Sequence, residues 1–212
     1  MSDWQRVRSG GAEFELRVLP VGTFENNVYL VRDPDTREGY VIDAGWEPDS
    51  IANALVDTNV KGILITHGHH DHHEGSRDQH GQLAALKQRL GVPVGIGGGD
   101  EDMLETPPDF TISDGQKFRF GKTTMQAIHT PGHTPGSTCF AVGNVVFTGD
   151  TLFPGGPGNT KTSTGDFPTI IASIRDKLFT LPEDTLVYPG HGKGTTIGTE
   201  KPHLDEWIAR GW

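Results

Sequence analysis

Four short apolar runs in this chain are each followed, within four residues, by a histidine or an aspartate. The runs span residues 62–66, 123–129, 144–149 and 185–190, and the side chains that follow them are His67, His133, Asp150 and His191. Imidazole nitrogen and carboxylate oxygen are ligands that zinc and similar metal ions prefer. Chance rarely ends four strands in this way, so the pattern predicts a fold that gathers four strand ends on one rim and binds metal there.

The first of these positions belongs to a histidine cluster. Residues 66–76 read THGHHDHHEGS and hold five of the ten histidines of the chain. His67 and His69 stand two apart on an extended segment, so both side chains can point the same way and hold one ion. Asp71 and His72 lie where the chain turns toward a helix, so they can face a second ion nearby.

Seven candidate ligands result, which is too many for one tetrahedral ion and suits two ions that share a carboxylate and a water. They are His67, His69, Asp71, His72, His133, Asp150 and His191. Asp43 is expected either to orient a ligand or to cap a turn. The other histidines are expected beside the ligands or in solvent (His70, His73), exposed (His80, His203) or in a structural hydrogen bond (His129).

The predicted elements alternate between strands and helices. Strands are expected at 13–20, 26–33, 40–45 and 61–66, with a helix at 47–57 capped by Asp49 or Ser50 and a helix that ends at Gly91. A second strand-rich stretch precedes helices at 166–181 and 202–211. Two sheets packed face to face with helices outside fit this order at least as well as one doubly wound sheet. We expect one domain over residues 1–212.

Two glycine-rich segments are not expected to bind nucleotides. GIGGGD (95–100) lacks the last glycine of a dinucleotide fingerprint, because Asp100 stands there, and it is expected to form a turn. GGPGNTKT (155–162) has Thr160 where a phosphate loop needs glycine. This second segment is expected to be a loop near the metal site.

The amino-acid composition limits the kinds of binding partner that the chain is expected to have. Lys and Arg total 18 against 28 Asp and Glu, a formal net charge of −10, which disfavours nucleic acid and anionic membranes and leaves a small-molecule substrate. The single cysteine, Cys139, is expected to be a buried small hydrophobe rather than a catalytic thiol. Because no disulfide can form and no apolar targeting or spanning run occurs, a cytoplasmic location is expected.

The ordered motifs THGHHDH, HTPGHTPGS, FTGDTLF and YPGHG, with NNVYLV and IDAG upstream, resemble the metallo-β-lactamase superfamily, in particular its glyoxalase II-like (hydroxyacylglutathione hydrolase-like) branch. The resemblance implies a four-layer αβ/βα sandwich. It implies that one metal is held by His67, His69 and His133 and the other by Asp71, His72 and His191, with Asp150 between them. True β-lactamases of the superfamily generally lack this bridging aspartate, so the resemblance does not imply antibiotic hydrolysis.

The resemblance extends to the metal centre and not to the glutathione contacts. Where glyoxalase II enzymes typically carry Gly-Cys-Gly-(Lys/Arg) followed by an aromatic residue, this chain has residues 156–159, GPGN, and then Lys161. The chain also continues only briefly after YPGHGKGTTIG. Asn159 and Lys161 are the candidate substrate contacts on this loop.

Two ions of the zinc type lower the pKa of a shared water toward neutrality. The expected activity is therefore hydrolysis of a thioester, lactone or other ester by a metal-bridging hydroxide, and Asp71, beside the second ion, is the candidate catalytic residue. One alternative is an oxidoreductase resembling the iron-dependent persulfide dioxygenases. A second alternative is a non-catalytic metal-binding module, although structural zinc sites are usually closed and lack a water position.

Overall fold

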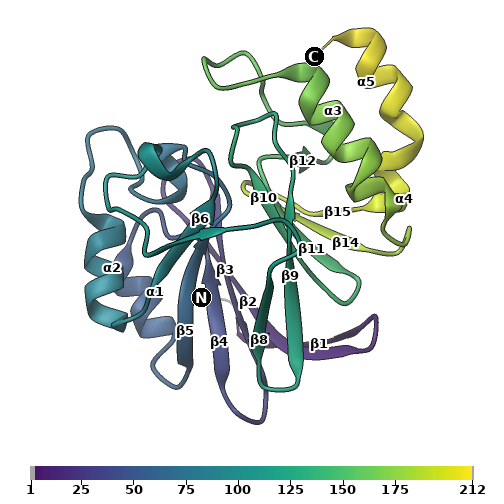
Figure 1. Ribbon diagram of the computed structural model, residues 1–212. Coiled ribbons are helices and arrows are strands. Elements are labelled where there is room, and N and C mark those ends of the chain that lie inside the picture. The colour runs from purple at the N-terminus through teal and green to yellow at the C-terminus, as the bar shows by residue number, and fades with distance from the viewer. Residues whose placement is uncertain (1–2, 212) are drawn as a thin grey trace.

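The computed structural model describes residues 3–211 and contains two large sheets that face each other (Figure 1). The first sheet has the order β1-β2-β3-β4-β5-β6-β7. Strands β1 to β4 are antiparallel neighbours, and β4 to β7 are parallel neighbours. Its strands are β1 Gln5–Ser9, β2 Ala12–Val21, β3 Asn26–Arg32, β4 Glu38–Ile42, β5 Asn59–Ile65, β6 Val94–Gly97 and β7 Phe110–Ile112.

The second sheet has the order β15-β14-β11-β10-β9-β8. Here β11 and β14 are parallel, and the other neighbours are antiparallel. A small ribbon of β12 and β13 follows β11 in the chain. The strands are β8 Lys117–Phe120, β9 Thr123–His129, β10 Thr138–Val142, β11 Val145–Gly149, β12 Leu152–Phe153, β13 Gly156–Pro157, β14 Leu186–Pro189 and β15 Thr195–Thr196.

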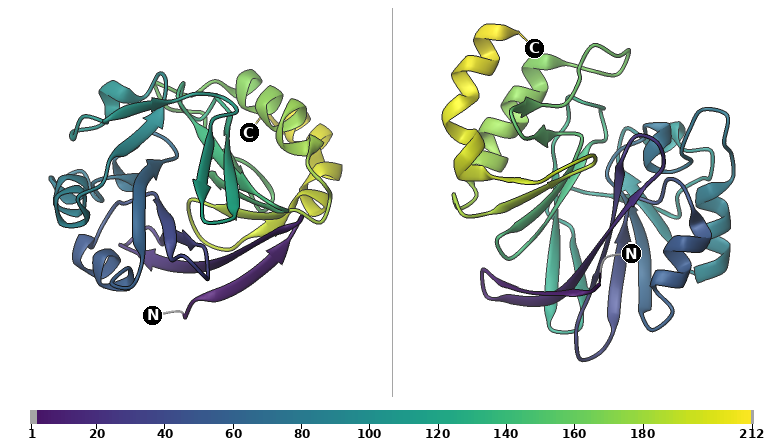
Figure 2. Two further views of the ribbon diagram at one scale, coloured as in Figure 1. Left: turned by 60° about the horizontal axis from the view of Figure 1, so that its bottom comes forward. Right: turned by 180° about the vertical axis from the view of Figure 1, so that it is seen from behind.

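Helices cover the outer face of each sheet, as both views of Figure 2 show. Helices α1 (Pro48–Ala54) and α2 (Gln82–Leu90) lie on the first sheet, and α3 (Phe167–Asp176), α4 (Ile197–Glu200) and α5 (Leu204–Arg210) lie on the second. Short 3-10 helices occur at His70–His72, Glu101–Met103, Leu178–Thr180 and Lys201–His203. None of the helices within residues 3–211 is both long and apolar enough to cross a membrane.

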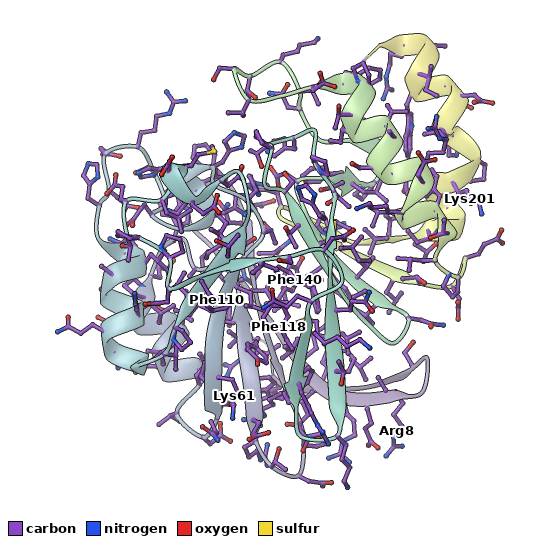
Figure 3. The ribbon with its side chains drawn as sticks, viewed as in Figure 1. Arg8, Lys61, Phe110, Phe118, Phe140 and Lys201 are labelled. Atoms are coloured by element: carbon purple, nitrogen blue, oxygen red, sulfur yellow. The ribbon has the colours of Figure 1, made fainter. Side chains whose placement is uncertain are left out.

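Three apolar clusters match the three interfaces of these four layers. One cluster joins the first sheet to α1 and α2 and includes Ile51, Ile63 and Leu86. The second fills the space between the sheets, where Figure 3 shows Phe118 and Phe140 while Arg8, Lys61 and Lys201 point outward. The third joins the second sheet to α3 and α5. Strands of both sheets therefore bury both faces, which gives the expected αβ/βα sandwich.

The glycine-rich segment 95–100 is only partly a turn. Its first half belongs to strand β6, which pairs with β5 and β7, so the expectation of a turn was wrong for residues 95–97. A Cβ on Gly95 would lie 2.3 Å from the Phe110 ring, and one on Gly97 would lie 2.0 Å from the Gly136 carbonyl oxygen. Close packing against neighbours, and not turn geometry, explains these glycines.

Two helices differ from the prediction at their ends. Helix α1 begins at Pro48 with Glu47 as its N-cap and no side-chain cap, so the capping roles expected for Asp49 or Ser50 were wrong. Proline at the first position has a suitable φ and lacks one of the N–H groups that a cap would satisfy. Helix α3 ends at Asp176 and is followed by a 3-10 turn, because Lys177 leaves the helical conformation with φ −120°.

Candidate metal centre

Strand ends from both sheets deliver the seven predicted ligands to one place. His67 follows β5 of the first sheet, whereas Asp150 and His191 follow the parallel strands β11 and β14 of the second. The side chains form three overlapping groups whose ligand atoms lie within 4.8 Å of one another. The groups are His67–His69–His133, His67–His72–Asp150 and Asp71–His72–His191.

The first group brings three imidazole rings together. Nδ1 of His69 lies 2.8 Å from Nε2 of His133, and the Nδ1 atom of His133 lies 2.8 Å from the Asn159 carbonyl oxygen. That carbonyl can only accept, so His133 donates from Nδ1 and turns its Nε2 toward the other rings of the group. Burial and the neighbouring imidazoles lower the pKa of His69 to about 4 and hold that of His67 well below its usual value. Lone pairs are therefore available for a cation.

The second group combines imidazoles with carboxylates. Nε2 of His191 lies 3.2 Å from both Nε2 of His72 and Oδ2 of Asp71. Burial lowers the pKa of His191, but the Asp150 and Asp71 carboxylates outweigh it and raise that pKa to about 10. The carboxylates thus favour positive charge at this point, which a divalent cation supplies in place of protons.

Asp150 lies between the two groups. Its Oδ1 is 3.4 Å from Nε2 of His72, and its Oδ2 is 3.6 Å from Nε2 of His133 and 3.5 Å from Nε2 of His191. Oδ1 of Asp150 and Nε2 of His67 are buried and find no hydrogen-bond partner within the described chain. Buried polar atoms without partners are costly. Their convergence, and the donor types around them, fit a site for divalent metal ions.

Two buried carboxylates outside the ligand set position the ligand loops. Asp43 contacts Nδ1 of His72 through Oδ2 at 2.8 Å and also accepts hydrogen bonds from the Thr66 amide and hydroxyl. It therefore orients His72, a candidate metal ligand. Asp100 accepts hydrogen bonds from the amides of Gly68 and Gly136, which join the loops that carry His69 and His133.

Asp100 and Asn26 support the site although no role there was predicted for them. The Asn26 amide nitrogen donates to Oδ2 of Asp71 at 3.0 Å and to the Asp71 carbonyl at 3.2 Å. An acidic residue directly after a glycine-rich strand end was the available signal for Asp100. Nothing in the sequence pattern marks Asn26 as a partner of Asp71, because the contact joins residues 45 positions apart.

The remaining histidines mostly have the expected surroundings. His80 and His203 are exposed, and Nε2 of His129 lies 2.9 Å from the Pro135 carbonyl oxygen, which confirms its structural hydrogen bond. His73 is fully buried, with Nε2 3.3 Å from the Gly68 carbonyl oxygen, so it does not face solvent. Cys139 is buried as expected, and burial raises the pKa of its thiol to about 11, far from that of a nucleophile at neutral pH.

A cavity of about 990 Å³ opens over the ligands, and a smaller one of about 290 Å³ lies beside Asp150. The large cavity is lined by Phe24, Gly68, His69, His70, Asp71, Gly75, Ser76, Arg77, Met103, Thr162 and His191. Asn159 lines the smaller cavity, and its side chain accepts a hydrogen bond from the Lys161 amide. Lys161 is exposed and lies in the chain between Asn159 and Thr162, which line different cavities.

A four-layer sandwich with a His/Asp centre at the strand ends between its sheets is the architecture of metallo-β-lactamase-like proteins. Residues 21–191 match the family model of the metallo-beta-lactamase superfamily, and the chain belongs to this superfamily. It is 34% identical over 208 residues to the hydroxyacylglutathione hydrolase GloC of Haemophilus influenzae, an alignment that covers 88% of this chain and 94% of the relative.

Several solved structures are similar to this chain in fold and in sequence. The BLEG-1 B3 metallo-beta-lactamase aligns with a TM-score of 0.79 at 28% identity and covers 89% of this chain and 97% of its own. ETHE1 from Myxococcus xanthus aligns with a TM-score of 0.76 at 31% identity, covering 89% and 82%. TTHA1623 in a di-iron-bound form aligns with a TM-score of 0.72 at 32% identity, covering 87% and 96%.

Proposed function

We propose that the chain is a dinuclear metal-dependent hydrolase of small-molecule thioesters, lactones or other esters, with zinc as its most suitable metal. The observation that carries this proposal is Asp150, whose carboxylate faces both ligand groups and lines the smaller cavity. An open cavity over the ligands argues against a purely structural metal module, because structural zinc sites are closed by protein ligands.

Two bound ions would supply Lewis acidity and a water of lowered pKa. His67, His69 and His133 would hold one ion, Asp71, His72 and His191 the other, and Asp150 would contact both. Asp71 also lines the cavity. Burial raises the pKa of Asp71, but His72, His191 and Asn26 lower it more, so this carboxylate stays ionised at neutral pH. It is suited to accept a proton or hydrogen bond from water and not to protonate a leaving group.

That protonation state favours substrates whose leaving group departs without a proton. A thiolate is such a group, so thioesters suit this site better than amides. The curated relative from Haemophilus influenzae is named a hydroxyacylglutathione hydrolase, and 94% of its length is aligned. This similarity supports thioester hydrolysis as the proposed activity, although the residues that contact glutathione in typical glyoxalase II enzymes are replaced here.

The cavity walls indicate what the rest of the substrate carries. Phe24 and Met103 offer apolar surface, and Arg77 is the one Lys or Arg side chain among the lining residues. We propose that the acyl or thiol part of the substrate bears an apolar group and an anionic group. Arg77 would bind the anion in the large cavity, and the loop of Asn159 and Lys161 would contact the substrate from the side of the smaller cavity.

An iron-dependent oxygenase is the second candidate, supported by the similarity to ETHE1 and to a di-iron protein. Metal analysis of protein purified without added metal, paired with assays on thioesters, lactones, a β-lactam and a persulfide, separates the candidates. Hydrolysis of a thioester or lactone by the zinc-loaded protein supports the proposal. The oxygenase would be the better assignment if the purified protein contains iron, consumes oxygen with a persulfide as substrate, and shows no hydrolysis when loaded with zinc.

A further inference from the structure

A second cluster of potential metal ligands lies outside the seven-residue centre. His70, His80 and Glu105 place one donor atom each within 4.8 Å of one another, and none of them belongs to the groups described above. His70 begins the 3-10 helix His70–His72, His80 lies shortly before α2, and Glu105 follows the 3-10 helix Glu101–Met103. Three separate parts of the chain therefore converge on one point.

The donor atoms have suitable spacing and direction. Oε1 of Glu105 lies 3.3 Å from Nε2 of His70 and 2.7 Å from Nδ1 of His80. In a tetrahedral zinc site with bonds of about 2.0–2.1 Å, donor atoms lie about 3.3 Å apart. Nδ1 of His70 lies 3.3 Å from the Gly75 carbonyl oxygen, which orients the ring so that Nε2 faces Glu105. A small outward movement of the His80 ring would lengthen its 2.7 Å distance to Glu105 toward the spacing of a tetrahedral site.

We propose that His70, His80 and Glu105 form a third metal site, which takes a divalent ion of the zinc class. Two imidazoles and one carboxylate favour zinc, copper or nickel over calcium or magnesium. The His80 side chain is 65% exposed and the Glu105 side chain 38%, so the remaining coordination positions can hold water. Hydrogen bonds between such exposed groups contribute little in water, whereas a shared ion would bind all three together.

An ion at this site would stiffen one wall of the large cavity. His70 lines that cavity together with Ser76, Arg77 and Met103. The third site joins the segment after Met103 to the segment that runs from His70 through Arg77 to His80. Its occupancy would therefore fix the position of Arg77 without adding a ligand to the Asp150 centre.

Zinc counting tests the proposal. Wild-type protein, His80→Ala, Glu105→Gln and the control His203→Ala are dialysed to equilibrium against the same free zinc concentration, and bound zinc per chain is measured by mass spectrometry. His203 is a matched control because it is exposed and pairs with Glu206 at 3.2 Å without belonging to a three-ligand group. We expect wild type and His203→Ala to bind one more ion than the other two variants. This difference does not depend on how many ions the Asp150 centre holds.

Trypsin cleavage after Arg77 gives a second readout. Zinc should slow this cleavage in wild type and His203→Ala and should have no effect in His80→Ala or Glu105→Gln. Equal zinc counts in all four proteins, or loss of the same ion in His203→Ala, would overturn the proposal. Circular dichroism checks folding, and all three substituted side chains are exposed.

Discussion

Oδ2 of Asp43 lies 2.8 Å from Nδ1 of His72, and the same carboxylate accepts hydrogen bonds from the amide and hydroxyl of Thr66. The aspartate at the end of β4 thereby connects the end of β5 to a metal ligand. The far nitrogen of His72 is directed toward Asp150 and His191 as a result. Residues that orient ligands in this way typically affect metal affinity or activity by 10–100-fold.

This relationship predicts a ranking of two substitutions. Asp43→Ala should reduce activity by about 10–100-fold, because His72 keeps its place in the chain but loses its orienting partner. Asp150→Ala should cost far more, since it removes the carboxylate that faces both ligand groups. Hydrolysis rates and metal content of both variants test this ranking. Comparable losses at equal metal content would show that Asp150 has no special position between the ions.

Gly190 provides a steric test of the same centre. A Cβ at this position would lie 2.3 Å from Oδ1 of Asp150 and 2.6 Å from Cε1 of His72. Gly190→Ala should therefore displace both side chains and reduce bound metal. Gly98→Ala is the control, because its nearest contact is the Thr111 methyl group at 3.3 Å. Metal content measured after gel filtration should fall only in Gly190→Ala, and full metal retention there would contradict the described placement of Asp150.

Substrate charge selectivity is expected to depend on two cations near the cavities. Arg77→Ala and Lys161→Ala should each raise KM for acidic thioesters by about tenfold, equivalent to ~1.4 kcal/mol, while metal content stays unchanged. Neutral substrates should be nearly unaffected. Lys201, which Figure 3 shows on the outer face near α4, supplies the control Lys201→Ala. Equal changes in KM for acidic and neutral substrates would show that neither Arg77 nor Lys161 recognises the anionic group of the substrate.

Acid sensitivity is expected from Asp33. Burial raises the pKa of this carboxyl, but hydrogen bonds from Thr36, Lys122 and Asp35 lower it more. Because the pKa is lower in the folded state, the ionised carboxyl stabilises the protein at pH values above the unfolded-state pKa of about 3.9. This stabilisation is lost as the pH falls through the folded-state pKa. Asp33→Asn should lower the free energy of unfolding by about 2 kcal/mol at pH 7.

Urea denaturation at several pH values tests this expectation. The difference between wild type and Asp33→Asn should be constant above about pH 5 and shrink below about pH 4. Asp35→Asn is the control, because the Asp35 side chain is 68% exposed and its pairing with Lys122 is screened by water. A difference that persists unchanged at acidic pH would mean that the charge of Asp33 is unimportant.

Local sequence pattern predicted the strands that precede the candidate ligands, because periodicity and residue chemistry are both local. The short or edge strands β1, β7, β12, β13 and β15 were not predicted. Strand β6 was missed since Gly95 and Gly97 resemble a turn in the sequence, while the structure requires glycine there to make room for Phe110 and Gly136. The N-terminal capping residue of α1 was also predicted wrongly, although the start of the helix was predicted to within one residue. Asp49, the expected cap, instead forms an ion pair with Arg89 of α2, a contact that depends on tertiary packing.

The same limit applies to the supporting residues of the site. His67, His69 and His72 stand out because they cluster in the sequence. Asp100 and Asn26 contact ligand loops that are distant in the chain, so their roles depend on tertiary packing. Asn26 reaches Asp71 because β3 and β5 belong to the same sheet, and Asp100 also joins the loop of Gly136, which follows a strand of the second sheet. The shape of the cavity, including the position of Arg77, likewise depends on how separate loops meet.

The order of the ligands along the chain has a consequence for synthesis. A ribosome makes the protein from its N-terminus, so the His67–His69–His133 group exists before His191 emerges. The group around Asp71 is completed only when His191, at the end of β14, reaches the first sheet, where its Nδ1 lies 2.9 Å from the Phe24 carbonyl oxygen. An ion held by this second group would therefore be acquired only after residue 191 has been made and β14 has paired with β11, so it would bind later than an ion held by His67, His69 and His133.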